Sequence, residues 1–251
     1  MLFKRLKRYV NSSKRKEVDT MNVVYTEIVT AADMLQSTIR IDELTQKMTQ
    51  QQVQLAAITN SKLYGVLPFW HALKNAGLSP VIGLTLHVTV SQHRRQLIVY
   101  AKDVQGYGQL LKLSSASSLR EHGDIPLKWL EGYRVGLKAM IPLCDATWLS
   151  DPKEDLATLK ALWLEDCIAG VARPGGHKSI EETYYEELCS NLNLPIGATH
   201  RSTFLEQEDV LAFEIAQAIE SGQKLNEREA LEETARYQYV PTAQQLTEWF
   251  I

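Results

Sequence analysis

From residue 22 onward, short apolar runs alternate with amphipathic stretches. The short runs are rich in β-branched residues, which is typical of strands, and in the longer stretches apolar residues recur at helical spacing. Seven strands are predicted, over residues 22–29, 53–59, 80–90, 96–101, 137–142, 166–171 and 194–199. Helices are predicted over residues 39–52, 63–75, 107–114, 156–164, 180–192 and 209–221. This alternation favours an α/β fold with a largely parallel sheet, and seven strands suit closure into a barrel.

The composition is that of an ordinary globular protein. The chain has 251 residues, of which 45% are hydrophobic and 23% charged, and this length allows one large domain or two small ones. No stretch approaches the roughly 18 apolar residues that a membrane span needs. The three cysteines are far apart and form no C-x-x-C pair, so neither a zinc ribbon nor a disulfide framework is indicated. A reduced, cytoplasmic compartment is therefore expected.

Charge is unevenly distributed along the chain. Residues 1–20 hold seven basic and two acidic residues, whereas the remainder is acidic and does not resemble a nucleic-acid clamp. The basic segment fits an arm that neutralises phosphates, or a surface helix with Leu2, Phe3, Leu6 and Val10 on one side. The third interpretation, a disordered extension, is the one we expect.

Functional side chains of an α/β barrel lie at the carboxyl ends of its strands. There the sequence offers mostly neutral residues, one carboxylate, Glu27, and two histidines, His87 and His200. Because side chains alternate along a strand, we expect Tyr25, Glu27 and Val29 on one face of the first strand, and Thr85 and His87 on one face of the third. A hydrolytic metal site needs several histidine and carboxylate ligands, so this set is poor. Arg201 would also oppose a bound cation. Of the six histidines, His200 is the best functional candidate because it follows a strand.

Common catalytic signatures are absent from the sequence. It has no phosphate-binding G-x-x-x-x-G-K-[ST] loop, no G-x-G-x-x-G after a strand and no G-x-S-x-G elbow. No Asp-x-Asp pair occurs, so a two-metal nucleotidyl-transfer site has no obvious ligands.

Four collinear segments nevertheless resemble a known family. They are ITNSKLYGVLPFWHALKNAGLSPVIGLTLHV (58–88), AKDVQGYGQLLKLSS (101–115), LKWLEGYRVGLKAMIP (127–142) and LPIGATHRSTFLEQEDVLAFEIAQAIESGQKL (194–225). With them, residues 21–251 resemble the N-terminal PHP (polymerase and histidinol phosphatase) domain of bacterial DNA polymerase III alpha subunits, in particular the DnaE-type enzymes of Gram-positive bacteria. The resemblance implies a distorted seven-stranded (β/α) barrel over residues 21–225. Residues 226–251 would then begin the segment that leads to polymerase domains missing from this chain, which is expected to be truncated before the palm.

The resemblance also implies metal-ligating positions, and this chain departs from the family at nearly all of them. Intact family members carry H-x-H-x-H on the first strand, Thr-Asp-His after the second, a carboxylate on the third and a late Asp-x-His. The corresponding residues here are Tyr25, Glu27, Val29, Thr59, Asn60, Ser61, Thr85, Arg201 and Thr203. Only Glu27 can bind a metal, and one carboxylate cannot hold a multinuclear cluster. No cofactor is therefore expected, although the family implies zinc or manganese at intact PHP sites and magnesium at the polymerase site.

The resulting hypothesis is the PHP portion of a DNA polymerase III alpha subunit, active in DNA replication, with a degraded metal site and a structural or interaction role. The family is a DNA-directed DNA polymerase, a nucleotidyltransferase, but this chain lacks the palm aspartates and is expected to be inactive alone. Its implied partners are the remaining polymerase domains or other replisome subunits. DNA would be contacted only indirectly or through residues 1–20, and no membrane is expected. The alternatives are a stand-alone PHP-type phosphoesterase or 3′–5′ exonuclease, and a nucleic-acid-binding accessory that uses residues 1–20.

Overall fold

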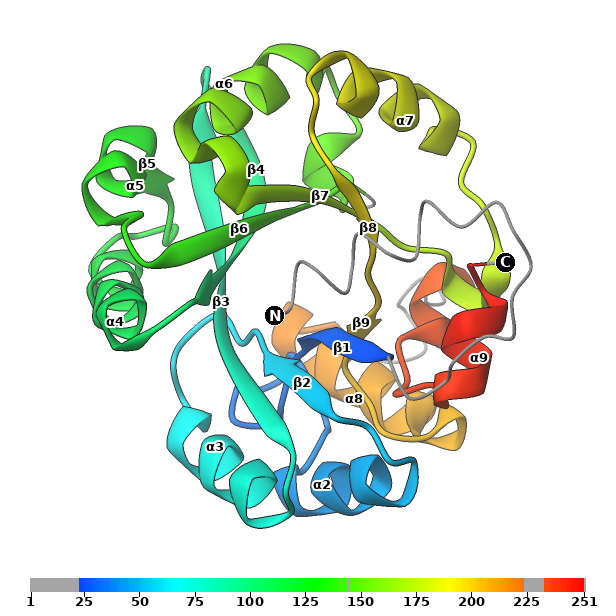
Figure 1. The fold of residues 1–251 in the computed structure, drawn as a ribbon. Helices are drawn as coiled ribbons and strands as arrows, with labels where there is room; N and C mark the ends of the chain where they lie inside the picture. Colours follow the sequence, from blue (N-terminus) through cyan, green and yellow to red (C-terminus); the bar gives the residue numbers. More distant parts are fainter. Residues whose placement is uncertain (1–22, 144, 224–232, 251) are drawn as a thin grey trace.

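The computed structural model describes residues 23–143, 145–223 and 233–250, and the two terminal segments predicted at 1–20 and 226–251 lie wholly or partly outside this range. A curled sheet with helices on its outer side forms the molecule (Figure 1). The strands are β1 (Val24–Ile28), β2 (Leu55–Ile58), β3 (Ser79–Val90), β4 (His93–Ala101), β5 (Ile125–Pro126), β6 (Leu137–Pro142), β7 (Cys167–Val171), β8 (Ile196–Ala198) and β9 (Arg201–Ser202). Each of the seven predicted strands is present.

One interrupted strand joins the two ends of this sheet. The strand order is β8-β7-β6-β4-β3-β2-β1-β9, with β5 added beside β3. β8 pairs with β7, and β9 pairs with β1, yet only Thr199 and His200 separate β8 from β9 in the sequence. The segment 196–202 therefore closes the sheet into a distorted barrel, which confirms the predicted fold class.

β4 is the exception to an otherwise parallel arrangement. It runs antiparallel to both β3 and β6. β3 and β4 form a tight hairpin whose two turn residues, Ser91 and Gln92, have φ values of 45° and 74°. Two consecutive residues with positive φ are typical of the turn that matches the twist of paired strands. The sequence prediction of a largely parallel sheet holds, but it placed the start of this strand at 96, three residues too late.

Helices surround the sheet in the described part of the chain. They are α2 (Ile41–Gln50), α3 (Val66–Asn75), α4 (Val104–Ser118), α5 (Leu127–Tyr133), α6 (Lys153–Trp163), α7 (Glu182–Asn191), α8 (Val210–Ser221) and α9 (Ala243–Glu248). Short 3₁₀ turns are η2 (Ala146–Trp148), η3 (Leu164–Asp166), η4 (Pro174–Gly176), η5 (Gln207–Asp209) and η6 (Glu233–Tyr237). The six predicted helices are present, and α5 and α9 lie outside those six ranges.

Apolar side chains fill both sides of the sheet. The barrel interior is a small cluster formed by Leu55, Ala57, Ile98, Tyr100, Met140 and Ile168. Outside the sheet, one cluster extends from β3 across α4 to α7. A second outer cluster packs α2 and α3 against β1 and β2. The middle of the barrel interior is thus a packed apolar core.

The N-terminus of α4 is fixed by a close approach of two glycines. A Cβ atom at Gly106 would lie 2.0 Å from the carbonyl oxygen of Gly136. Asp103 caps the same turn, because its side chain accepts a hydrogen bond of 2.8 Å from the Gly106 backbone N–H. Only glycine fits at position 106 without moving backbone atoms.

A buried ion pair holds the tip of the β3–β4 hairpin against α6. The Arg95 guanidinium donates to Asp155 at 2.6 Å, and both side chains are 1% exposed. Arg95 also donates to the backbone carbonyls of Thr147 and Asp151 and lies 5.0 Å from the ring centroid of Trp148. The guanidinium is therefore surrounded by acceptors and an aromatic face, as a buried cation requires.

Candidate functional site

A bulge in β1 decides which side chains face the barrel interior. Tyr25 lies opposite Ala56, but Ile28 lies opposite Ile58, so β1 carries one residue more than β2 in this interval. Tyr25 and Ile28 consequently both pack in the outer cluster against α2 and α3. The prediction that Tyr25 and Glu27 share one face is wrong, because the extra residue breaks the alternation of a regular strand.

Tyr25 has a structural role on the outside of the barrel. Its side chain is 2% exposed. The hydroxyl oxygen lies 2.5 Å from the carbonyl oxygen of Pro241 and 3.0 Å from Oε1 of Gln51. Tyr25 therefore links β1 to the end of α2 and to the segment before α9, and burial raises the pKa of its phenol.

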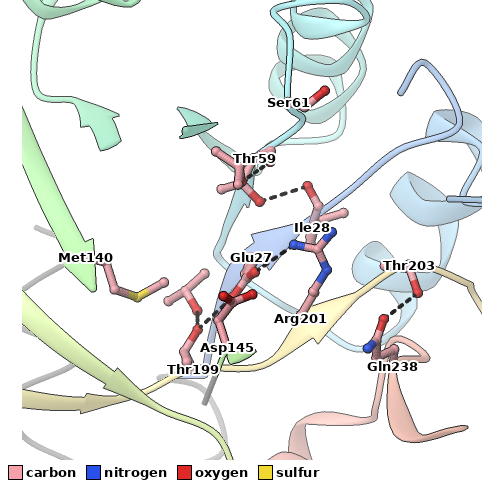
Figure 2. A network of polar contacts seen from close by, with 12 residues as sticks. Glu27, Ile28, Thr59, Ser61, Met140, Asp145, Thr199, Arg201, Thr203 and Gln238 are labelled. Atoms are coloured by element: carbon pink, nitrogen blue, oxygen red, sulfur yellow. Dashed lines mark hydrogen bonds and ion pairs between the residues drawn. The ribbon is translucent and has the colours of Figure 1, made fainter. Parts of the chain in front are cut away.

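Glu27 is the centre of a buried polar network at the carboxyl end of β1 (Figure 2). Arg201 lies directly opposite Glu27 in the β1–β9 pair, and its Nη1 is 3.3 Å from Oε1 of Glu27. Thr199 Oγ1 lies 3.5 Å from the other carboxylate oxygen and 2.9 Å from Thr26 Oγ1. Because closure of the barrel brings β9 to β1, this network exists only in the closed barrel.

Two effects on the Glu27 carboxyl oppose each other. Burial raises its pKa, and the neighbouring Arg201 guanidinium lowers it, with burial the stronger effect. Asp145, which Figure 2 shows close to Glu27, raises the pKa further through charge repulsion. The net pKa of Glu27 is raised, so the site favours the uncharged acid more than a solvated glutamate does.

The candidate positions after β2 hold neighbouring loops in place. Asn60 accepts a hydrogen bond of 2.8 Å from the Thr30 backbone N–H and donates to the Thr30 hydroxyl and the Tyr64 carbonyl. Ser61 donates to Asp33 through its backbone N–H at 2.6 Å and its hydroxyl at 2.8 Å. These bonds join the loop after β2 to the loop after β1, and the amide of Asn60 is engaged on both sides.

Thr85 and His87 share the inner face of β3. The Thr85 hydroxyl donates to the Thr59 carbonyl at 2.6 Å, and Thr59 is fully buried. His87 is partly buried, and burial followed by the nearby Arg94 lowers its pKa. The structure thus brings His87 to the side of the barrel that carries Thr85, as the sequence predicts, but in a form that resists protonation.

The candidates after β8 turn toward the C-terminal segment. His200 Nε2 lies 2.9 Å from the Tyr239 carbonyl oxygen, and its ring centroid is 5.1 Å from that of Trp249. Burial lowers the His200 pKa to about 4. The Thr203 hydroxyl donates to Gln238 at 3.0 Å. The prediction of His200 as the best functional histidine is not supported by this geometry, which gives it a packing contact instead.

Val29, the candidate directly after β1, contributes only an apolar side chain. It is 1% exposed, and its backbone N–H donates to the Ser202 carbonyl at 3.0 Å. The hydrogen bond extends the β1–β9 pairing by one residue beyond the strand. Val29 therefore supports closure of the barrel.

These residues do not fit a multinuclear zinc or manganese centre. Across residues 23–143, 145–223 and 233–250, no three histidine, cysteine or carboxylate side chains gather as metal ligands. Asp145 is already engaged, because its Oδ1 accepts from the Thr147 backbone N–H at 2.9 Å and from the Thr147 hydroxyl. The Arg201 guanidinium supplies the positive charge next to Glu27 that a cation would otherwise supply.

Sequence reasoning missed three contributors to the network around Glu27. Thr26 and Thr199 sit at strand positions that carry no distinguishing signal, and Asp145 lies in a loop 118 residues after Glu27. Asp145 precedes Ala146-Thr147 in the sequence, a spacing typical of a cap for a short helical turn. That signal indicates the cap but not its proximity to Glu27.

Fold and site together define a distorted (β/α) barrel with a buried polar cluster at the carboxyl end of its first strand. The chain matches the family described as "PHP domain" over residues 28–170, more than half of its length, and it belongs to this family. Within the described residues, no helix has the length and apolar character needed to cross a membrane.

The relatives of this chain include proteins named DNA polymerase III subunit alpha. The protein of Bacillus subtilis is 24% identical over 222 residues, which cover 84% of this chain and 20% of the relative. The protein of Halalkalibacterium halodurans is 29% identical over 213 residues, covering 80% of this chain and 19% of the relative. The resemblance to alpha subunits is confirmed, and the chain spans about one fifth of the length of these relatives.

A solved structure supports the fold assignment. An amidohydrolase from Chromobacterium violaceum superimposes with a TM-score of 0.51 at 9% identity, covering 72% of this chain and 87% of the amidohydrolase. At this identity the likeness concerns the fold alone.

Proposed function

We propose that this chain acts as the PHP portion of a DNA polymerase III alpha subunit in DNA replication, in a structural or interaction role. The observation that carries the proposal is the Glu27–Arg201 pair, which places an arginine where the family carries metal ligands. An ion pair inside a barrel joins β1 to β9 but offers no bound hydroxide for hydrolysis. In this proposal nucleotidyl transfer belongs to the rest of the polymerase, and the chain alone is inactive.

The partners that follow are the remaining polymerase domains or other replisome subunits, in the cytoplasm. Support comes from the alpha subunits that the chain resembles, which are about four times as long. DNA would be contacted only indirectly or through residues 1–20.

Metal content and hydrolysis test the structural role. The chain is purified from cells supplied with zinc and manganese, and bound metal is measured by mass spectrometry alongside cleavage of bis(p-nitrophenyl) phosphate and of single-stranded DNA. We expect less than one equivalent of metal and no cleavage above that of the Glu27→Ala variant. One or more equivalents of metal, lost together with hydrolysis in Glu27→Ala, would establish a PHP-type phosphoesterase or 3′–5′ exonuclease instead.

An antibody raised against residues 21–251 tests the place in replication. In an extract of the source cells, we expect either a band about four times larger than 28.4 kDa or a 28.4 kDa band that co-purifies with replicative polymerase activity. A 28.4 kDa band that separates completely from the polymerase would overturn it.

A further inference from the structure

α8 is apolar on two opposite faces. One face packs on the barrel side through Phe213 and Ala218, each 5% exposed. The other carries Leu211, Ile215 and Ile219, which are 54%, 44% and 62% exposed, with Ala212 and Ala216 beside them. Residues four apart align along a helix, so the exposed set forms one continuous stripe. A helix that is apolar nearly all round is normally covered on both sides.

The border of this α8 stripe is acidic. Between Ser202 and Ser221 the sequence contains five acidic residues and no lysine or arginine. Glu206 pairs with Lys47 and Glu214 with Arg236, whereas the Glu220 carboxylate contacts the amide groups of Gln36 and Gln217. Among the described residues, Glu208 and Glu220 form no ion pair with a lysine or arginine. An occupant with an apolar side flanked by positive charge would therefore match the α8 stripe and these two carboxylates.

We propose that the occupant is the segment 2–16 of this same chain, LFKRLKRYVNSSKRK. Its apolar residues Leu2, Phe3, Leu6 and Val10 are spaced i, i+1, i+4 and i+8, which is the spacing of Leu211, Ala212, Ile215 and Ile219. The segment holds seven basic residues and no acidic one. It therefore combines the apolar pattern and the charge that the α8 stripe requires.

The connectivity of the barrel supports docking within one chain. The segment precedes β1 in the sequence, and β1 pairs with β9, the strand that leads to α8. α8 also contacts the loop that follows β1, because the Gln217 amide donates to the Leu35 carbonyl at 2.8 Å. Phe213 of α8 packs against Phe204, two residues after β9. The acidic border would orient the basic segment, and apolar contact would supply the affinity.

Zero-length carbodiimide cross-linking of the full chain tests the proposal. We expect links from Lys4, Lys7 or Lys14 to Glu208, Glu214 or Glu220, identified by mass spectrometry. The Ile215→Gln variant should lose them, and the matched control Leu67→Gln, a similarly exposed residue on α3, should keep them. A mixture of light and ¹⁵N-labelled protein distinguishes links within one chain from links between two copies.

Tryptic cleavage after the basic residues of the segment gives a second readout. Because Ile215→Gln removes one apolar side chain from the contact, we expect tryptic cleavage of the segment to be about tenfold faster in this variant than in wild type. Salt at 0.5 M should also accelerate the cleavage. Cross-links to the α7 carboxylates Glu186 and Glu187 that are as abundant as those to Glu208, Glu214 or Glu220 would overturn the proposal. Cleavage rates that Ile215→Gln leaves unchanged would overturn it as well. Cross-links found only between different copies of the chain would also contradict the proposal. The same holds for protection from trypsin that requires added DNA, since the segment would then bind another partner.

Discussion

Removal of the Asp155 carboxylate is expected to be among the most destabilising single changes in this molecule. Asp155→Leu leaves the Arg95 guanidinium, 1% exposed, with two backbone carbonyls and a tryptophan face but no counter-charge. Breaking a buried pair from one side costs about 3–5 kcal/mol. For a chain of this size that loss lowers the melting temperature by about 10 °C. The physical cause is the uncompensated cation, not the loss of packing volume.

A thermodynamic cycle separates these two causes. Unfolding in urea, followed by tryptophan fluorescence and circular dichroism, is measured for Arg95→Met, Asp155→Leu and the double variant. Because the double variant buries no charge, we expect it to be more stable than Asp155→Leu, with a coupling free energy of at least about 1.5 kcal/mol. Arg94→Ala is the matched control, since the neighbouring Arg94–Asp124 pair is partly exposed and is expected to contribute under about 1 kcal/mol. Additive losses, or an Asp155→Leu variant as stable as Arg94→Ala, would refute the reasoning.

Three further changes test the closure of the barrel and its glycine contact. Gly106→Ala places a methyl group against the Gly136 carbonyl and should lower the melting temperature by several degrees, while Gly108→Ala on the open side of α4 should not. Glu27→Gln removes a carboxyl whose folded-state pKa is raised. Because the wild type loses stability as pH rises through that pKa, the variant should become more stable relative to the wild type toward alkaline pH. A variant that becomes less stable than the wild type there would show that pairing with Arg201 dominates. His200 has a folded-state pKa of about 4, below its unfolded value. Its contribution to the free energy of unfolding is therefore present above about pH 6.5 and falls by about 3 kcal/mol on acidification to pH 4. Urea titrations of His200→Asn across this range should show a flatter pH dependence than those of the wild type.

Local sequence patterns were sufficient for most of the barrel. β-branched runs located the strands, and apolar spacing located all the longer helices, because both signals come from residues close in sequence. The tip of the hairpin escaped prediction since Arg95 looks like a loop residue. Its burial depends on Asp155, 60 residues away. No local sequence pattern indicates that a charged side chain will be buried and neutralised by a residue far away in the sequence.

The site was harder to predict than the fold. The positions of Glu27 and Arg201 were identified as degenerate metal-site positions, but their contact requires β9 to pair with β1 in one register. The assignment of Tyr25 to the same face failed at a bulge, which inserts one residue without a distinctive sequence signal. Side-chain direction near such an irregularity follows from tertiary pairing rather than from alternation.

Closure by the 196–202 segment also has a consequence for synthesis of the chain. β1 emerges from the ribosome well before its partner on one side, because Arg201 is translated 174 residues after Glu27. Until then one edge of β1 has unpaired backbone groups, and an exposed edge of this kind invites pairing with other chains. The β1–β9 contact forms late because its loop-closure entropy is large. A nascent barrel of this design therefore depends on rapid completion of translation, or on a chaperone that covers β1 in the interval.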